Sequence, residues 1–268
     1  MGRSTNTSDQ PWFPFGKGDS YLDRTCWPLN CLIFIIPFLL FYQIGSVIQP
    51  LAEEQRTPIH VMAFVLMLRF FSVFGAVGSY LPVLTVLLLL LGWHFAEQKR
   101  NKLYRWRWEP KIYLAMAGES ILWAIPAFVI GLAALRQMAP AMTLGVTTVP
   151  VLDLPWTTAA VLSVGAGIYE ELLFRLVLIA LLDWLLRDLF EWKNFYAIPV
   201  IVVGSALLFS AYHALGDTAL KPSHFFYLTA FGIYCAGVFI YRGFGIVVGA
   251  HAVYDLMIVA WYLYRGVL

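Results

Sequence analysis

The sequence predicts an all-α fold, a polytopic transmembrane helical bundle of six to eight spans. Of the 268 residues, 60% are hydrophobic and only 13% are charged, which is about half the charged share of a typical soluble domain. Several apolar runs reach the roughly 20 residues that a helix needs to cross a bilayer. The runs are continuous, whereas a transmembrane β-barrel requires short alternating strands. Helices also satisfy their backbone groups internally, as lipid demands.

Apolar runs of helical length follow a polar N-terminal segment, residues 1–28, which lacks the pattern of a cleavable signal peptide. The runs are 29–47, 60–96, 112–135, 158–182, 195–213, 225–241 and 246–263. Glycine and proline at 75–82 interrupt the second run, which is either two spans or an interfacial helix followed by one span. We expect a single membrane domain, with N-terminal helices over 29–135 and C-terminal helices over 136–268.

The charges between the runs predict which side of the membrane each connection faces. Residues 97–111 contain two acidic and six basic side chains, the latter being Lys99, Arg100, Lys102, Arg105, Arg107 and Lys111. The positive-inside rule makes this loop cytoplasmic, and residues 137–155, which lack lysine and arginine, are expected on the other side. We expect an integral, multi-pass protein of a bacterial cell (inner) membrane, in contact with the lipid bilayer. The net charge of +2 gives no reason to expect a nucleic-acid partner.

Three ionisable residues, Glu170, Glu171 and Arg175, lie inside the run 158–182. Charges at this depth cost several kcal/mol on insertion scales, so each is expected to have a partner or a function. On a helix, Glu171 and Arg175 share a face in the order that favours an ion pair. Glu170 lies about 100° around the helix, which leaves it available as a general base. Alternatively, both glutamates neutralise Arg175 and hold helices together.

Two histidines in later runs add to this cluster. His213 ends the run 195–213, and His251 lies one helical turn before Asp255 in the last run. Amide hydrolysis needs a base for water, a donor for the developing oxyanion and the exclusion of bulk water. Glu170, His213 and His251 can fill these roles inside a membrane. Glu119 and Arg69, in contrast, stand alone in their runs, where they either hold helices together or support the site.

Three short motifs follow one another on three apolar runs: Glu170-Glu171-x-x-x-Arg175, Phe209-x-x-x-His213 and His251-x-x-x-Asp255. Their order resembles that of the CAAX-protease and bacteriocin-processing family. This family includes the type II CAAX prenyl endopeptidases, which are glutamate-dependent intramembrane proteases. The resemblance covers about residues 165–259, and the N-terminal runs match the family in hydropathy alone.

The resemblance implies a role for each motif residue. Glu170 matches the glutamate that, with the histidine at His213, holds and activates the attacking water. Glu171 and Arg175 match residues that orient the site, and His251 matches a histidine that helps to stabilise the oxyanion. The substrate implied is a membrane-associated protein or peptide, and no cofactor is expected.

Asp255 departs from the residue that this family often has, which is asparagine. An asparagine amide can donate a hydrogen bond to an oxyanion, whereas an ionised aspartate would repel it. Asp255 is therefore expected either to be protonated or to act by orienting His251. Helix counting also places His213 near the end of its span and His251 near the start of a later one. Tilted or broken helices, with breaks at Gly216, Gly243, Gly245 or Gly249, would be needed to bring both to Glu170.

Two other interpretations remain open. The chain lacks HExxH, the usual zinc-protease helix motif, but Glu170, His213 and His251 could form a three-ligand zinc site with an open fourth position. A non-proteolytic protein, either a proton-coupled transporter or a family scaffold or immunity protein, is the second alternative, because transporters also use intramembrane glutamates and histidines. The absence of an inverted repeat argues against transport.

Overall fold

The structure, a computed structural model, describes residues 18–52, 60–102, 104, 106–135, 154–215 and 221–266. These ranges contain helices and no strands, which confirms the predicted all-α fold. The elements are α1 (Tyr21–Arg24), α2 (Pro28–Ala52), α3 (Met62–Val73), α4 (Leu81–Arg100), α5 (Pro110–Leu135), α6 (Trp156–Glu171), η3 (Leu172–Leu178), α7 (Ile179–Asp183), η4 (Trp184–Leu189), α8 (Asn194–Ala214), α9 (Pro222–Arg242) and α10 (Phe244–Tyr264). Most of the loop predicted to be non-cytoplasmic, as well as Arg105 and Gly216, lies outside the described residues.

Six of these helices are long and apolar enough to cross a membrane, which agrees with a multi-pass protein of six to eight spans. The spans are Pro28–Ile48, Leu81–Arg100, Pro110–Ala133, Asn194–Ala214, Pro222–Arg242 and Phe244–Tyr264. The predicted span 158–182 falls within a helical run, 156–189, in which α6 and α7 alternate with the π-helical segments η3 and η4. The run 60–96 divides into the short helix α3 and the span α4 near Gly75, whose φ of 77° ordinary side chains rarely adopt.

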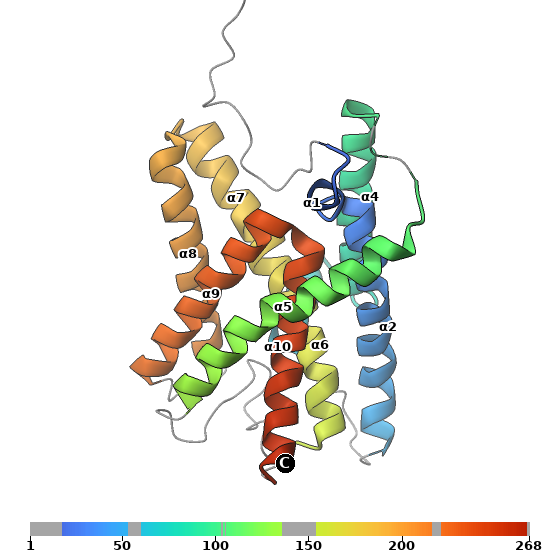
Figure 1. Ribbon diagram of the computed structural model, residues 1–268, viewed down its shortest axis with the longest axis vertical. Coiled ribbons are helices and arrows are strands. Elements are labelled where there is room, and N and C mark those ends of the chain that lie inside the picture. The colour runs from blue at the N-terminus through green and yellow to red at the C-terminus, as the bar shows by residue number, and fades with distance from the viewer. Residues whose placement is uncertain are drawn as a thin grey trace, which may run out of the picture.

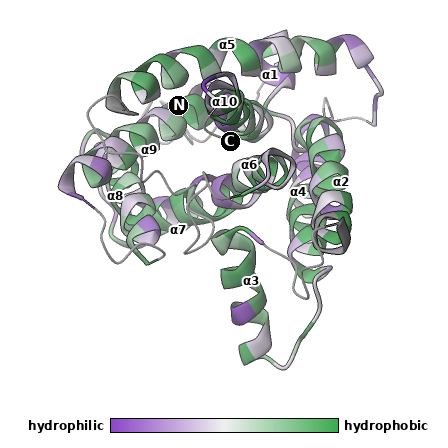
Figure 2. Ribbon diagram, turned by 90° about the horizontal axis from the view of Figure 1, so that it is seen from below, coloured by the Kyte–Doolittle hydropathy of each residue, from purple (hydrophilic) through white to green (hydrophobic). Residues whose placement is uncertain are grey.

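The helices that carry the motifs lie next to one another in the bundle. Helix α10 packs mainly against α6 and α5, and α8 packs mainly against α9. Figure 1 shows α5 and α9 running obliquely past α10. Viewed along the bundle, α6 and α10 lie near its centre and α3 lies at its edge (Figure 2). The tilted helices therefore surround a central pair that contains two of the three motifs.

Small residues allow the central helices to approach one another closely. A β-carbon on Gly167 of α6 would lie 2.8 Å from the backbone nitrogen of Ala252 and 3.0 Å from the carbonyl oxygen of Val248. A side chain at this position would therefore push α6 away from α10. A β-carbon on Gly232 of α9 would likewise lie only 3.0 Å from the Cα of Ala206 on α8. The contact at Gly167 brings the first motif against the third, and the contact at Gly232 brings α9 against α8.

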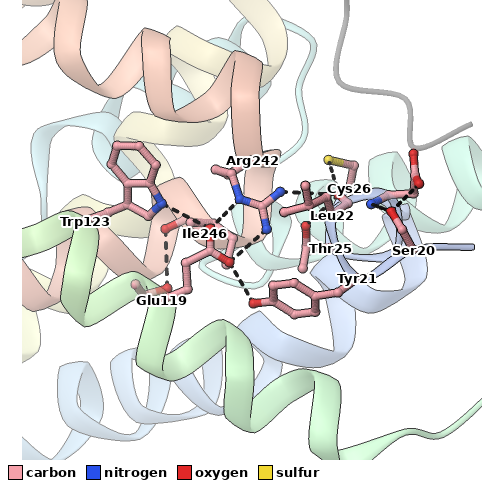
Figure 3. A network of polar contacts seen from close by, with 11 residues as sticks. Ser20, Tyr21, Leu22, Thr25, Cys26, Glu119, Trp123, Arg242 and Ile246 are labelled. Atoms are coloured by element: carbon pink, nitrogen blue, oxygen red, sulfur yellow. Dashed lines mark hydrogen bonds and ion pairs between the residues drawn. The ribbon is translucent and has the colours of Figure 1, made fainter. Parts of the chain in front are cut away.

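Glu119 of α5 joins three parts of the chain (Figure 3). Its carboxylate accepts hydrogen bonds from the guanidinium of Arg242 at the end of α9, including one of 2.8 Å from Nη2 to Oε2. Tyr21 of α1 donates to Oε2 at 2.7 Å, and the indole of Trp123 donates to Oε1 at 3.1 Å. Of the two roles expected for Glu119, these contacts confirm that it holds helices together. Arg69, on α3, is exposed.

Candidate active site

The structure brings the six predicted site residues together in the interior of the bundle. They are Glu170 and Glu171 at the end of α6, Arg175 in η3, His213 at the end of α8, and His251 and Asp255 on α10. All six side chains are buried. Such a concentration of ionisable groups away from solvent is typical of a functional site.

Glu170 faces both histidines through the same carboxylate oxygen. Its Oε2 atom lies 3.8 Å from Nε2 of His213 and 4.0 Å from Nε2 of His251. These separations are longer than direct hydrogen bonds. They suit a small polar group, such as a water molecule, that bonds to more than one of the three atoms.

The other ring nitrogen of each histidine fixes the ring's orientation. Nδ1 of His213 lies 2.9 Å from the carbonyl oxygen of Phe209, one turn earlier in α8. Because a carbonyl oxygen only accepts, Nδ1 of His213 must carry a proton, and in the neutral ring Nε2 then keeps its lone pair. Nδ1 of His251 lies 2.7 Å from Oε1 of Glu171, and an ionised carboxylate likewise only accepts. Both Nε2 atoms are therefore directed toward Glu170.

The predicted pairing of Glu171 with Arg175 is present. Oε2 of Glu171 lies 3.0 Å from Nε of Arg175, although the N–H does not have hydrogen-bond alignment with that oxygen. The guanidinium also stacks on the Phe209 ring, with 4.6 Å between Cζ and the ring centroid, and Nη2 donates to the carbonyl oxygen of Gly232 at 3.5 Å. Arg175 thereby connects α6, α8 and α9 through Glu171, Phe209 and Gly232.

Asp255 lies beside His251, as its position one turn later on α10 predicts. Its Oδ2 atom is 3.6 Å from Nε2 of His251, the same nitrogen that faces Glu170. The carboxyl group of Asp255 therefore lies next to His251, which in turn faces Glu170. Its two expected roles, as a protonated side chain or in orienting His251, stay predictions.

His213 and His251 can both approach Glu170, as predicted, because of the way in which α9 and α10 are joined. Helix α9 ends at Arg242 and α10 begins at Phe244, so Gly243 alone connects them. Gly243 has a φ of 83°, a conformation that glycine adopts at little cost. Together with the oblique course of α9 (Figure 1), this abrupt turn lets His251 lie at the depth of Glu170. Gly243 is one of the predicted break points.

Two side chains that the motif analysis did not single out also line the site. The hydroxyl of Tyr212 donates to Oε1 of Glu170 at 3.2 Å. Cys235 of α9 has its sulfur within 4.8 Å of ligand atoms of Glu171 and His251. Neither residue gave a sequence signal, because Tyr212 is adjacent to His213 and therefore off its helical face, and Cys235 lies in a run without other polar motifs.

Two sets of side chains have the chemistry of metal ligands. Glu170, His213 and His251 are residue types that bind zinc, and each histidine has its Nδ1 held by a carbonyl or carboxylate, as ligating histidines usually do. In this role they would hold an ion that acts as a Lewis acid toward a carbonyl oxygen. In the second set, Glu171, Cys235 and His251, the charge of Glu171 is already balanced by Arg175. The zinc alternative therefore concerns the first set and stays a prediction.

Comparison with known proteins finds a family model that matches part of the chain. Residues 152–257 match the family model of the Rce1-like type II CAAX prenyl endopeptidases. The match includes all six site residues and confirms the predicted family resemblance over this part of the chain. The Rce1-like segment thus carries the signature of a membrane protease family. No curated protein and no solved structure matches the chain in the corresponding searches.

Proposed function

We propose that the protein is an intramembrane endopeptidase in which Glu170 and His213 activate a water molecule. The observation that carries this proposal is the position of Oε2 of Glu170 between the Nε2 atoms of His213 and His251, at 3.8 and 4.0 Å. A water at this point would contact a base and a hydrogen-bond acceptor at once. The Rce1-like match over 152–257 supports the same reaction class.

Each group has a defined task in the proposed reaction. Glu170 removes a proton from the water as its oxygen attacks the peptide carbonyl carbon, and His213 Nε2 accepts the water's other hydrogen bond. The carbonyl oxygen becomes an oxyanion. His251, as an imidazolium, donates from both ring nitrogens, from Nδ1 to Glu171 and from Nε2 to the oxyanion. Glu170 then returns the proton to the leaving amine nitrogen as the C–N bond breaks.

The location of the site suits a membrane-associated protein or peptide as the substrate. The six residues are buried among apolar helices, so bulk water is excluded and electrostatic interactions within the site are strong. A substrate that is itself held in the bilayer would reach this depth without crossing an aqueous phase.

The decisive variant is Glu170→Gln, which keeps the size of the side chain and removes the base. We expect the purified, bilayer-reconstituted variant to cleave a CAAX-type reporter peptide about 10²–10⁴-fold more slowly than the wild type. Glu97→Gln is a suitable control, because Glu97 pairs with the exposed Arg100 in α4 and lies outside the site. Thermal unfolding of each variant establishes that it is folded.

A substrate search in cells complements the reporter assay. Membrane proteomes from cells that express the wild type or Glu170→Ala are compared, and an uncleaved precursor should accumulate with the variant. If a folded Glu170→Gln protein processes its substrate at the wild-type rate, the peptidase proposal fails. The non-proteolytic alternatives, transport or a scaffold role, would then be favoured.

A further inference from the structure

The two carboxylate oxygens of Glu170 have different surroundings. Oε2 faces the Nε2 atoms of His213 and His251, as described above. Oε1 instead accepts a hydrogen bond of 3.2 Å from the hydroxyl of Tyr212. Tyr212 is only 4% exposed, so this bond is shielded from competing water. The phenol hydroxyl thus binds Oε1, and Oε2 faces the histidines.

The ring of Tyr212 is fixed by aromatic neighbours. It packs against Phe174 with 5.1 Å between centroids, and against the ring of His213 with 4.9 Å between centroids and an interplanar angle of 90°. The backbone N–H of Ala63, in the first turn of α3, faces the same hydroxyl. The first N–H groups of a helix have no partner within it, and no side chain caps α3. With a donor on that side, the hydroxyl proton is directed to Glu170.

We propose that Tyr212 is a positioning residue, which holds Oε1 of Glu170 so that Oε2 points at the water site between His213 and His251. This inference rests on the proposed peptidase function. The terminal torsion of a glutamate is broad and roughly two-fold, so an unrestrained carboxylate could turn its oxygens away from the reacting water. Small misplacements of a reacting group can reduce rates about 10²-fold.

Tyr212→Phe tests the proposal, because it removes the hydroxyl and keeps the ring that packs on Phe174. We expect kcat toward the reporter peptide to fall about 10- to 10²-fold with KM unchanged. Tyr169→Phe is the matched control. Tyr169 is also buried and precedes Glu170 directly, but its hydroxyl has no hydrogen-bond partner in the described part of the chain. Its removal should leave kcat within about twofold of the wild type, because no bond is lost.

A spectroscopic measurement separates positioning from a general loss of stability. The infrared band of the Glu170 carboxyl group is identified as the difference between the wild type and Glu170→Gln. We expect this band to shift in Tyr212→Phe and to stay in place in Tyr169→Phe. A rise in KM without a fall in kcat, or an unshifted band, would overturn the positioning role.

The outcomes also distinguish this inference from the proposed function. If Glu170→Gln retains peptidase activity, the proposed function fails whatever Tyr212 does. If Glu170→Gln is inactive while Tyr212→Phe keeps wild-type kcat, the proposed function stands and the role of Tyr212 is wrong.

Discussion

Nδ1 of His251 lies 2.7 Å from Oε1 of Glu171, across the interface between α10 and α6. The second oxygen of the same carboxylate pairs with Arg175 at 3.0 Å. Glu171 therefore connects the guanidinium to the histidine that faces Glu170. The orientation of His251 depends on a charged pair that is almost completely buried, with exposed side-chain fractions of 1% for Arg175 and 0% for Glu171.

The Glu171–Arg175 pair should be coupled in stability and in activity. Arg175→Met leaves the buried carboxylate of Glu171 without the guanidinium, and we expect it to lower the free energy of unfolding by about 3–5 kcal/mol. Glu171→Gln leaves the buried guanidinium of Arg175 without its carboxylate and should lower the free energy of unfolding by a similar amount. The double variant removes both charges of this pair, so we expect it to be more stable than the sum of the single effects predicts. Its activity should stay low. Thermal unfolding measures the stability of each variant, and reporter cleavage measures its activity. Strictly additive losses of stability would contradict the coupling.

Substitutions of Asp255 test what the aspartate does at a position where the family often has asparagine. If the residue acts by orienting His251, an asparagine can replace it, because an amide can also bond to an imidazole nitrogen. We expect Asp255→Asn to keep the rate within about tenfold of the wild type, and Asp255→Leu to reduce it about 10²-fold. An equal loss in both variants, measured as kcat at a fixed substrate concentration above KM, would show that the negative charge itself is required.

Metal dependence is tested by dialysis against a chelator before the reporter assay. Because the proposed reaction uses Glu170 as the base and His251 as the oxyanion donor, we expect activity to survive the treatment. Metal content is measured in the same samples. If activity is abolished and then restored by added zinc, the metal-free mechanism is wrong and Glu170, His213 and His251 become the expected ligands.

The network around Glu119 should matter for stability and not for the chemical step. Glu119→Gln removes the charge that binds Arg242 and weakens the contact with Tyr21. Hydrogen bonds to charged groups contribute about 1.5–3 kcal/mol each, so the melting temperature should fall by several degrees. Reporter cleavage well below that temperature should match the wild type. Arg69→Gln, at an exposed position of α3, serves as the control and should leave the melting temperature unchanged.

Local pattern was enough to predict the helices and the pairs within them. The apolar runs coincide with α2, α5, α8, α9 and α10 within a few residues, because a helix in lipid must be apolar over its whole length. The pairing of Glu171 with Arg175 was equally predictable, since residues four apart on a helix are neighbours. The pattern allows either one or two spans over 60–96, because glycine and proline mark a break without fixing the length of the helices on either side.

Contacts between helices could be predicted only where motifs suggested them. The sequence by itself determined an all-helical membrane protein with Glu170, His213 and His251 on three apolar runs. The tertiary structure decided that Oε2 of Glu170 faces both histidines, that Tyr212 takes Oε1, and that Arg242 is the partner of Glu119. The physical reason is that spacing along a helix fixes which side chains share a face. The tilt and rotation that set which faces meet arise from packing between helices, as where Gly167 of α6 lies against α10.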